Sequence, residues 1–232
     1  MLRKMVMVWF FLLLGALWSF SPSLSQVEAA PAVIVDQYDY KDGWFSLKYP
    51  HIDGLENQAV QAKINQQIEA KVDEFIAETQ NTFDQNQEAL ARGLSFSATM
   101  QYQVYRNEGN LLSLTLNTYV FAGGAHGSPY SSGYTFDLTT GQKLAFGDLF
   151  CWNDAAKQEL SQKVLEQVQA RKLYIFTPYK GVADQPNFYL TGDNKVGIIF
   201  QKYSLGAGAL GILTFEFPYS RETGQSCFTI KP

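Results

Sequence analysis

The chain has few of the residues that most often carry catalysis or bind metals, with 2 cysteines and 2 histidines among 232 residues. His51 and His126 stand at none of the short spacings that hold zinc, so the sequence supplies a zinc site poorly. No nucleophile elbow is present, and the carboxylates form no persuasive acid/base pair. The composition also lacks any mark of disorder or of a fibrous repeat, since 46% hydrophobic residues is ordinary for a globular core. A metalloenzyme is therefore not indicated.

Basic residues are also in short supply. The sequence holds 18 Lys and Arg against 22 Asp and Glu, which gives a net charge of −4. Without residues 1–29 the balance is 16 against 21, a net charge of −5. Binding of nucleic acid requires a basic stripe, so we expect no nucleic-acid partner. The mild negative charge leaves open an attraction to a basic protein.

The first segment has the pattern of a targeting signal. Arg3 and Lys4 give a short positive region, and Met5–Phe20 is apolar apart from one serine. This order is typical of a signal peptide, and the apolar run is shorter than the ~20 residues of a membrane-spanning helix. We expect residues 1–29 to be a signal peptide, with an uncleaved membrane anchor as the alternative. The rest of the chain is then extracytoplasmic: secreted, periplasmic or on the cell surface.

Both cysteines, Cys151 and Cys227, lie in the part that is expected to be exported. An even number of cysteines outside the cytoplasm permits one disulfide. A domain of this size also folds without such a link, and two buried free thiols are the alternative. The sequence leaves both states open.

Alternation of apolar and polar residues predicts strands, and apolar residues three to four positions apart predict helices. The strands are expected at 32–40, 44–49, 95–106, 111–120, 136–138, 188–190, 195–203, 212–219 and around 227–230. A first amphipathic helix is expected from 55 to 93, with a break near Asn81 and Gly93 as its C-terminal cap. A second is expected from an N-cap at Asn153 to about Lys172.

This order of elements predicts the α+β class, with two long amphipathic helices packed on one face of mostly antiparallel sheet. No low-complexity linker separates the two halves of the chain. We therefore expect one compact body.

The most unusual stretch is the glycine-rich run Gly123–Gly127, which lies between two predicted strands. Its three glycines permit positive φ and a close approach of the backbone to a ligand, and they surround His126. Such a histidine holds the loop by hydrogen bonds, contacts a ligand or acts in catalysis; with Ser128 and Asp137, a Ser-His-Asp arrangement is conceivable. The candidate ligand-binding residues lie in this run and just after it: Gly123, Gly124, His126, Gly127, Tyr130 and Tyr134.

A second glycine-rich run, Gly206–Gly211, matches the GxGxxG pattern of dinucleotide-binding proteins. That pattern binds a cofactor only where the glycines open a helix, whereas the residues that follow here are strand-like and end in Pro218. We therefore expect a loop between strands and no cofactor.

Several of these stretches resemble one known pair of domains. Tyr119–Gly127, Phe136–Gly141 and Gly147–Phe150 resemble the motif that joins two domains of unknown function, and Tyr203–Gly211 is similar to the end of the second. The paired domains occur in the extracytoplasmic part of the lysozyme-sensing anti-sigma factor RsiV and in front of the deacetylase domain of PdaC.

The resemblance implies two domains, 30–130 and 131–232, packed as one body. It implies an exported, non-enzymatic binding or sensing domain at the bacterial cell envelope, with a lysozyme-like protein or a peptidoglycan-derived ligand at the run Gly123–Gly127. Two alternatives stay open: a hydrolase of cell-wall material that uses His126, and a structural envelope protein. A membrane is expected as a partner only through an uncleaved N-terminal segment.

Overall fold

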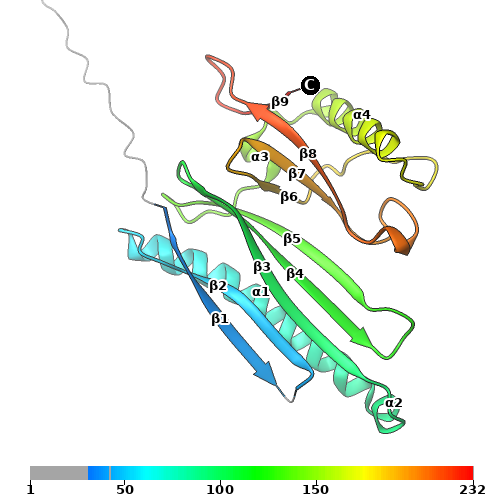
Figure 1. Ribbon diagram of the computed structural model, residues 1–232. Coiled ribbons are helices and arrows are strands. Elements are labelled where there is room, and N and C mark those ends of the chain that lie inside the picture. The colour runs from blue at the N-terminus through cyan, green and yellow to red at the C-terminus, as the bar shows by residue number, and fades with distance from the viewer. Residues whose placement is uncertain (1–30, 42, 232) are drawn as a thin grey trace, which may run out of the picture.

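The computed structural model describes residues 31–41 and 43–231, and within them the chain forms two sheets with a long helix on each (Figure 1). The expected signal peptide or anchor lies outside the described residues. No helix in the described ranges is both long and apolar enough to cross a membrane. The α+β class and the mostly antiparallel pairing are confirmed.

The first sheet has five strands in sequence order. They are β1 (Val33–Lys41), β2 (Phe45–Asp53), β3 (Phe96–Glu108), β4 (Leu111–Ala122) and β5 (Ser128–Asp137). All neighbouring pairs are antiparallel except β2 and β3, which run parallel. The exception follows from the connection, because two helices return the chain to the same end of the sheet before β3 begins.

Two helices link β2 to β3. Helix α1 (Gln58–Gln85) begins at Asn57, whose side chain accepts hydrogen bonds from the N–H groups of the first turn, and α2 (Gln87–Ala91) follows directly. The break between them lies at Asn86, five residues after the expected position near Asn81, because the apolar stripe continues through Phe83 onto the sheet. Gly93, expected as a cap, follows α2 with φ of 91°.

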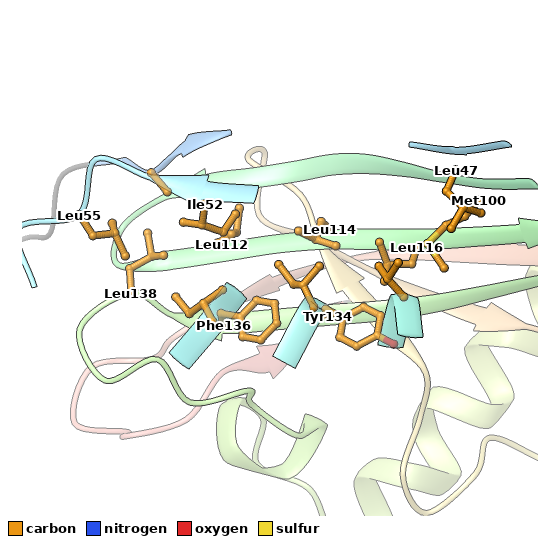
Figure 2. Close-up of a cluster of buried hydrophobic side chains, with 14 of the residues drawn as sticks. Leu47, Ile52, Leu55, Met100, Leu112, Leu114, Leu116, Tyr134, Phe136 and Leu138 are labelled. Atoms are coloured by element: carbon orange, nitrogen blue, oxygen red, sulfur yellow. The ribbon is translucent and has the colours of Figure 1, made fainter. Parts of the chain in front are cut away.

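The core of the first sheet lies between α1 and one sheet face. Leu112, Leu114 and Leu116 share that face, as their alternation predicts, and Figure 2 shows them beside Tyr134 and Phe136 of the neighbouring strand. The apolar stripe of α1 packs against them. Burying a leucine side chain fully contributes about 1.5–3 kcal/mol, so this face fixes the register of β4 and β5.

The second sheet is smaller and follows two more helices, α3 (Phe146–Leu149) and α4 (Asp154–Ala170). Its strands pair in sequence order and are antiparallel: β6 (Phe188–Leu190), β7 (Lys195–Phe200), β8 (Leu213–Ser220) and β9 (Thr229–Ile230). Helix α4 begins at Asn153 as predicted, since Asn153 Oδ1 accepts from Ala156 N over 2.9 Å. Its apolar face packs on this sheet and forms a second core.

Cys151 and Cys227 form a disulfide in the structure, with their Cα atoms 5.3 Å apart. Cys151 follows α3 and Cys227 precedes β9. Backbone hydrogen bonds reinforce the link, because Cys151 N donates to Phe228 O and Phe228 N donates to Leu149 O. The pair therefore joins the last strand to the beginning of the second half.

The two sheets pack against each other through the face of β4 and β5 that is turned away from α1. Ser113 and Thr135 are buried there, and Ser113 Oγ accepts from Leu190 N of β6 over 2.8 Å. An irregularity in β3 between Val104 and Arg106 brings Tyr105 onto β6, where its ring stacks on that of Tyr189. Both faces of β4 are therefore buried from Leu112 to Leu116.

Arg106 joins the sheets beside this irregularity in β3. Its Nη1 donates to Thr191 O, Asn194 Oδ1 and Tyr219 Oη, over 2.9–3.3 Å. The guanidinium is mostly shielded from solvent, so these bonds to the second half act in a partly dry environment.

Strands β2 and β7 end at residues other than those expected. Strand β2 continues through Pro50 to Asp53. Strand β3 pairs only with Phe45–Leu47, so the edge of β2 at Pro50 that faces β3 has no pairing strand. Proline is tolerated there because it has no N–H to donate. Strand β7 ends at Phe200, where the chain turns toward the first half. The domain division at residue 130 stays a prediction; that residue lies within β5, the last strand of the first sheet.

Candidate functional site

The run Gly123–Gly127 forms the turn between β4 and β5. Gly123 has φ of 77°, a conformation that other residues rarely adopt. A side chain at Gly127 would collide with the ring of Tyr119, which lies against its backbone. The glycines are therefore needed for the path of this turn and for the position of one tyrosine.

His126 points from this turn to the second half of the chain. Its Nδ1 lies 3.1 Å from Lys202 Nζ and its Nε2 lies 3.2 Å from Tyr203 Oη. The ammonium of Lys202 can only donate, so it selects the neutral tautomer in which Nδ1 accepts and Nε2–H donates to Tyr203. The hydroxyl hydrogen of Tyr203 then remains available to a ligand.

The second glycine-rich run meets this turn. Lys202 Nζ also donates to Gly127 O over 3.0 Å, and the ring of Tyr203 lies over Gly208. The run Gly206–Gly211 is the loop from β7 to β8 with one 3₁₀ turn, as expected, rather than the start of an α-helix that could hold a pyrophosphate. The two motifs that carry the family resemblance are thus in direct contact.

Exposed aromatic rings gather around this contact. Tyr203 is 52% exposed, and Tyr119 is exposed beside Gly127. Tyr174, 91% exposed, and Phe176 flank the second run, since Phe176 N donates to Leu205 O. We call these residues the aromatic corner: Tyr119, His126, Tyr174, Phe176 and Tyr203.

The six predicted ligand-binding residues separate into three places. Gly123, Gly124, His126 and Gly127 form the turn itself. Tyr130 is exposed on the face of the sheet that carries α1. Successive residues of a strand face opposite sides, and Pro129, the residue before Tyr130, pairs with Tyr119 on the other face.

Tyr134, the last of the six candidates, is not exposed as a ligand-binding residue beside the glycine-rich run would be. It is 6% exposed and belongs to the core of the first sheet, since α1 covers that part of β5. Burial raises the pKa of its hydroxyl. The amine of Lys143, whose pKa burial lowers, lies 4.3 Å from the centre of the ring.

The conceived Ser-His-Asp arrangement is not formed. Ser128 and Asp137 are the first and last residues of β5, which separates them by about 30 Å at 3.4 Å per residue. Asp137 Oδ1 accepts from the N–H and hydroxyl of Thr139 at that far end. His51 lies in β2 against Asn65, and the described part of the chain holds no cluster of three or more metal-ligating side chains.

Sequence reasoning missed Lys202, Tyr174 and Phe176. Tyr203 stood in a motif that was recognised, and its φ of 70° marks a constrained turn. Tyr174 and Phe176 lie in the connector between α4 and β6, where two aromatic residues in a segment outside the predicted strands and helices were the available signal.

Comparison with known families gives two matches that together span most of the chain. Residues 38–129 match the family model described as Deacetylase PdaC, and residues 147–220 match the model described as Protein of unknown function (DUF3298). The resemblance to these paired domains is confirmed. The first match includes β2 to β4 with α1, and the second includes α4 with β6 to β8.

Individual relatives agree with this assignment. The anti-sigma-V factor RsiV of Bacillus subtilis is 22% identical over 210 residues, which cover 85% of this chain and 70% of RsiV. Among solved structures, a DUF3298 family member from Bacteroides fragilis has a TM-score of 0.55 at 17% identity, and one from Pseudomonas aeruginosa has 0.51 at 15%. Each alignment covers 81% of this chain and 88% of the other, and these likenesses establish the fold.

Proposed function

We propose that the protein is an extracytoplasmic, non-enzymatic binding or sensing domain that captures a protein ligand through the aromatic corner. The observation that carries the proposal is the gathering of exposed rings where two glycine-rich loops from opposite halves meet. Exposed apolar groups that gather in one place mark interaction sites more often than scattered ones do. Aromatic residues also dominate the energetics of protein interfaces.

Two rings of the corner, those of Tyr119 and Tyr203, are held in place without a ligand. Tyr203 is held by His126 on one side and lies over Gly208 on the other. Tyr119 lies against Gly127. Such pre-organisation reduces the entropy that a partner must overcome on binding, so a small exposed surface can still bind a partner selectively.

The similarity to RsiV and the net charge of −5 for residues 30–232 support a basic protein ligand of the lysozyme type. A peptidoglycan fragment is the second ligand to test, because the similarity to PdaC supports a cell-wall setting. The large exposed area of Tyr174 and Phe176 favours the protein, since it offers apolar contact without a surrounding pocket.

Calorimetric titration of the purified chain with lysozyme, and separately with muramidase-digested peptidoglycan, tests the proposal. We expect saturable binding of lysozyme that falls at least about tenfold in a Tyr174→Ser/Phe176→Ser variant. His126→Ala should weaken binding in the same direction, because Tyr203 loses its partner. Both variants should melt at the wild-type temperature, since these side chains are exposed.

Tyr130→Ala is the matched control, because Tyr130 is about as exposed as Phe176, 53% against 55%, but lies on the face of the first sheet opposite to Tyr119. Loss of lysozyme binding in the control as well would contradict the aromatic corner as the site. Absence of heat with lysozyme, together with saturable heat from peptidoglycan fragments, would assign a glycan ligand instead.

A further inference from the structure

A groove of about 480 Å³ lies on the α1 face of the first sheet, away from the aromatic corner. Helix α1 forms one wall with Phe75 and Glu78, and the floor is formed by β3, β4 and β5. Thr118 pairs with Tyr130 across the floor, one position along from the pair of Tyr119 and Pro129. Because alternate residues face opposite sides of a sheet, the groove and the corner are separate surfaces.

The floor presents a row of hydroxyls and rings. Ser128, Tyr130, Ser132 and Tyr134 alternate along β5 and line the groove at steps of about 6.8 Å. Tyr130 is 53% exposed, and its side chain makes no hydrogen bond or ring contact with any other described residue. The groove thus offers an unused aromatic ring flanked by two serine hydroxyls.

This lining restricts the class of ligand. The backbone groups of β4 under the floor are paired with β3 and β5, so a peptide would find no free main-chain partners there. Aromatic rings stack on the apolar C–H faces of sugar rings, and side-chain hydroxyls form hydrogen bonds with the hydroxyls at the edges of those rings. The lining of the groove therefore matches a sugar chain.

The charges of the α1 wall restrict the ligand further. Lys71 forms an ion pair with Glu74, and Glu78 has no ion-pair partner among the described residues. Lys71 is also attracted to Glu78, so the wall carries two carboxylates and one ammonium. This net negative charge opposes phosphate or carboxylate ligands and favours an amine.

From these features we propose that the groove binds a short chain of amino sugars. The ring of Tyr130 stacks on one sugar, the hydroxyls of Thr118, Ser128 and Ser132 bond to its neighbours, and the carboxylate of Glu78 accepts from a free 2-amino group. This site does not depend on the aromatic corner and does not require a protein ligand.

The experiment is calorimetric titration of the purified chain with three hexasaccharides of equal length: β-1,4-linked glucosamine, its N-acetylated form, and cellohexaose. We expect saturable binding that is strongest for the glucosamine oligomer and weaker for the acetylated one. Tyr130→Ala should weaken binding of the glucosamine oligomer about tenfold, because the stacking surface is lost. Glu78→Gln should weaken the glucosamine oligomer and leave the acetylated oligomer unchanged.

Tyr174→Ser is the matched control, since it removes an exposed ring from the aromatic corner and should leave hexasaccharide binding as in the wild type. Thermal melting of each variant checks that the fold is retained. The proposal is overturned if none of the sugars gives saturable heat, if Tyr130→Ala binds as the wild type does, or if all three sugars bind equally well.

Discussion

The backbone N–H of Gly133 in β5 donates to the side-chain Oδ1 of Asn187 over 2.8 Å, while Asn187 Nδ2 donates to Ser131 O over 2.7 Å. One side-chain amide thus bonds to β5 as a neighbouring strand would. Gln201 repeats the arrangement at Ser131, where it accepts from the N–H and donates to the carbonyl. The outer edge of the first sheet is therefore closed by two amides of the second half, which protects it from pairing with other chains.

Asn187→Ala should destabilise the fold by about 1–2 kcal/mol, because the partly buried N–H of Gly133 loses its acceptor and the carbonyl of Ser131 keeps only its bond from Gln201. The free energy of unfolding from urea denaturation is the measurement. Asn81→Ala is a suitable control, since Asn81 makes its hydrogen bond on the exposed face of α1 and should change stability by less than about 0.5 kcal/mol. Equal effects of the two substitutions would show that the amide does not hold the edge.

Gly133→Ala tests how closely the two sheets approach. An added Cβ would lie 1.8 Å from Phe188 O, a backbone atom of β6 that cannot move aside alone. We expect a loss of stability of at least about 3 kcal/mol, at the upper end for overpacking in a core.

Gly147→Ala provides the comparison for this substitution. Its Cβ would meet Trp152 at an ordinary distance of 3.9 Å, and it should have a small effect. A Gly133→Ala protein as stable as the Gly147→Ala protein would contradict the close contact of β5 with β6.

The sequence predicted the elements better than their assembly. Leu112, Leu114 and Leu116 alternate so regularly that their shared face and its covering helix follow from local pattern alone. The burial of Tyr134 could not be predicted in this way. Tyr130 and Tyr134 lie on the same face of β5 and fit the same alternating pattern, although only Tyr134 is covered. Only the length of α1 and its position on the sheet separate Tyr134 from Tyr130.

Only the local part of the candidate site could be predicted, because the rest depends on tertiary packing. His126 and the glycines around it were identifiable from composition. Their contact with Lys202 and Tyr203 joins residues more than seventy positions apart and depends on how the second sheet packs on the first. No local pattern carries that information, although both segments stood in recognisable motifs.

Asp36 is expected to make stability sensitive to acid. Its carboxylate accepts from Tyr102 and pairs with Lys48 Nζ at 2.9 Å, which ties together β1, β2 and β3. The hydrogen bond from Tyr102, followed by that from Lys48, lowers the pKa of Asp36 below its ordinary value of 3.8. The stabilisation is therefore present above pH 3.8 and is lost as the pH falls through the lowered value.

Asp36→Asn should reduce the melting temperature at neutral pH and remove part of its decline below pH ~4. Melting followed by circular dichroism from pH 7 to pH 2 measures both effects. The control is Asp84→Asn on the exposed side of α1, where Gln80 is the partner. A pH profile of Asp36→Asn parallel to that of the wild type would show that Asp36 does not contribute to acid sensitivity.

The disulfide between Cys151 and Cys227 should stabilise the second half, because it closes a loop of 76 residues in the unfolded chain. Links of this kind contribute about 2–4 kcal/mol. We expect the Cys151→Ser/Cys227→Ser protein to unfold at a lower urea concentration than the wild type. Added reductant should lower the stability of the wild type to that of the double variant and leave the double variant unchanged.

Titration of thiols in the denatured, unreduced wild type should find none. Two reactive thiols there, or a reductant effect that persists in the double variant, would refute the assignment, and the backbone bonds of Phe228 alone would then hold β9 to the rest of the second half.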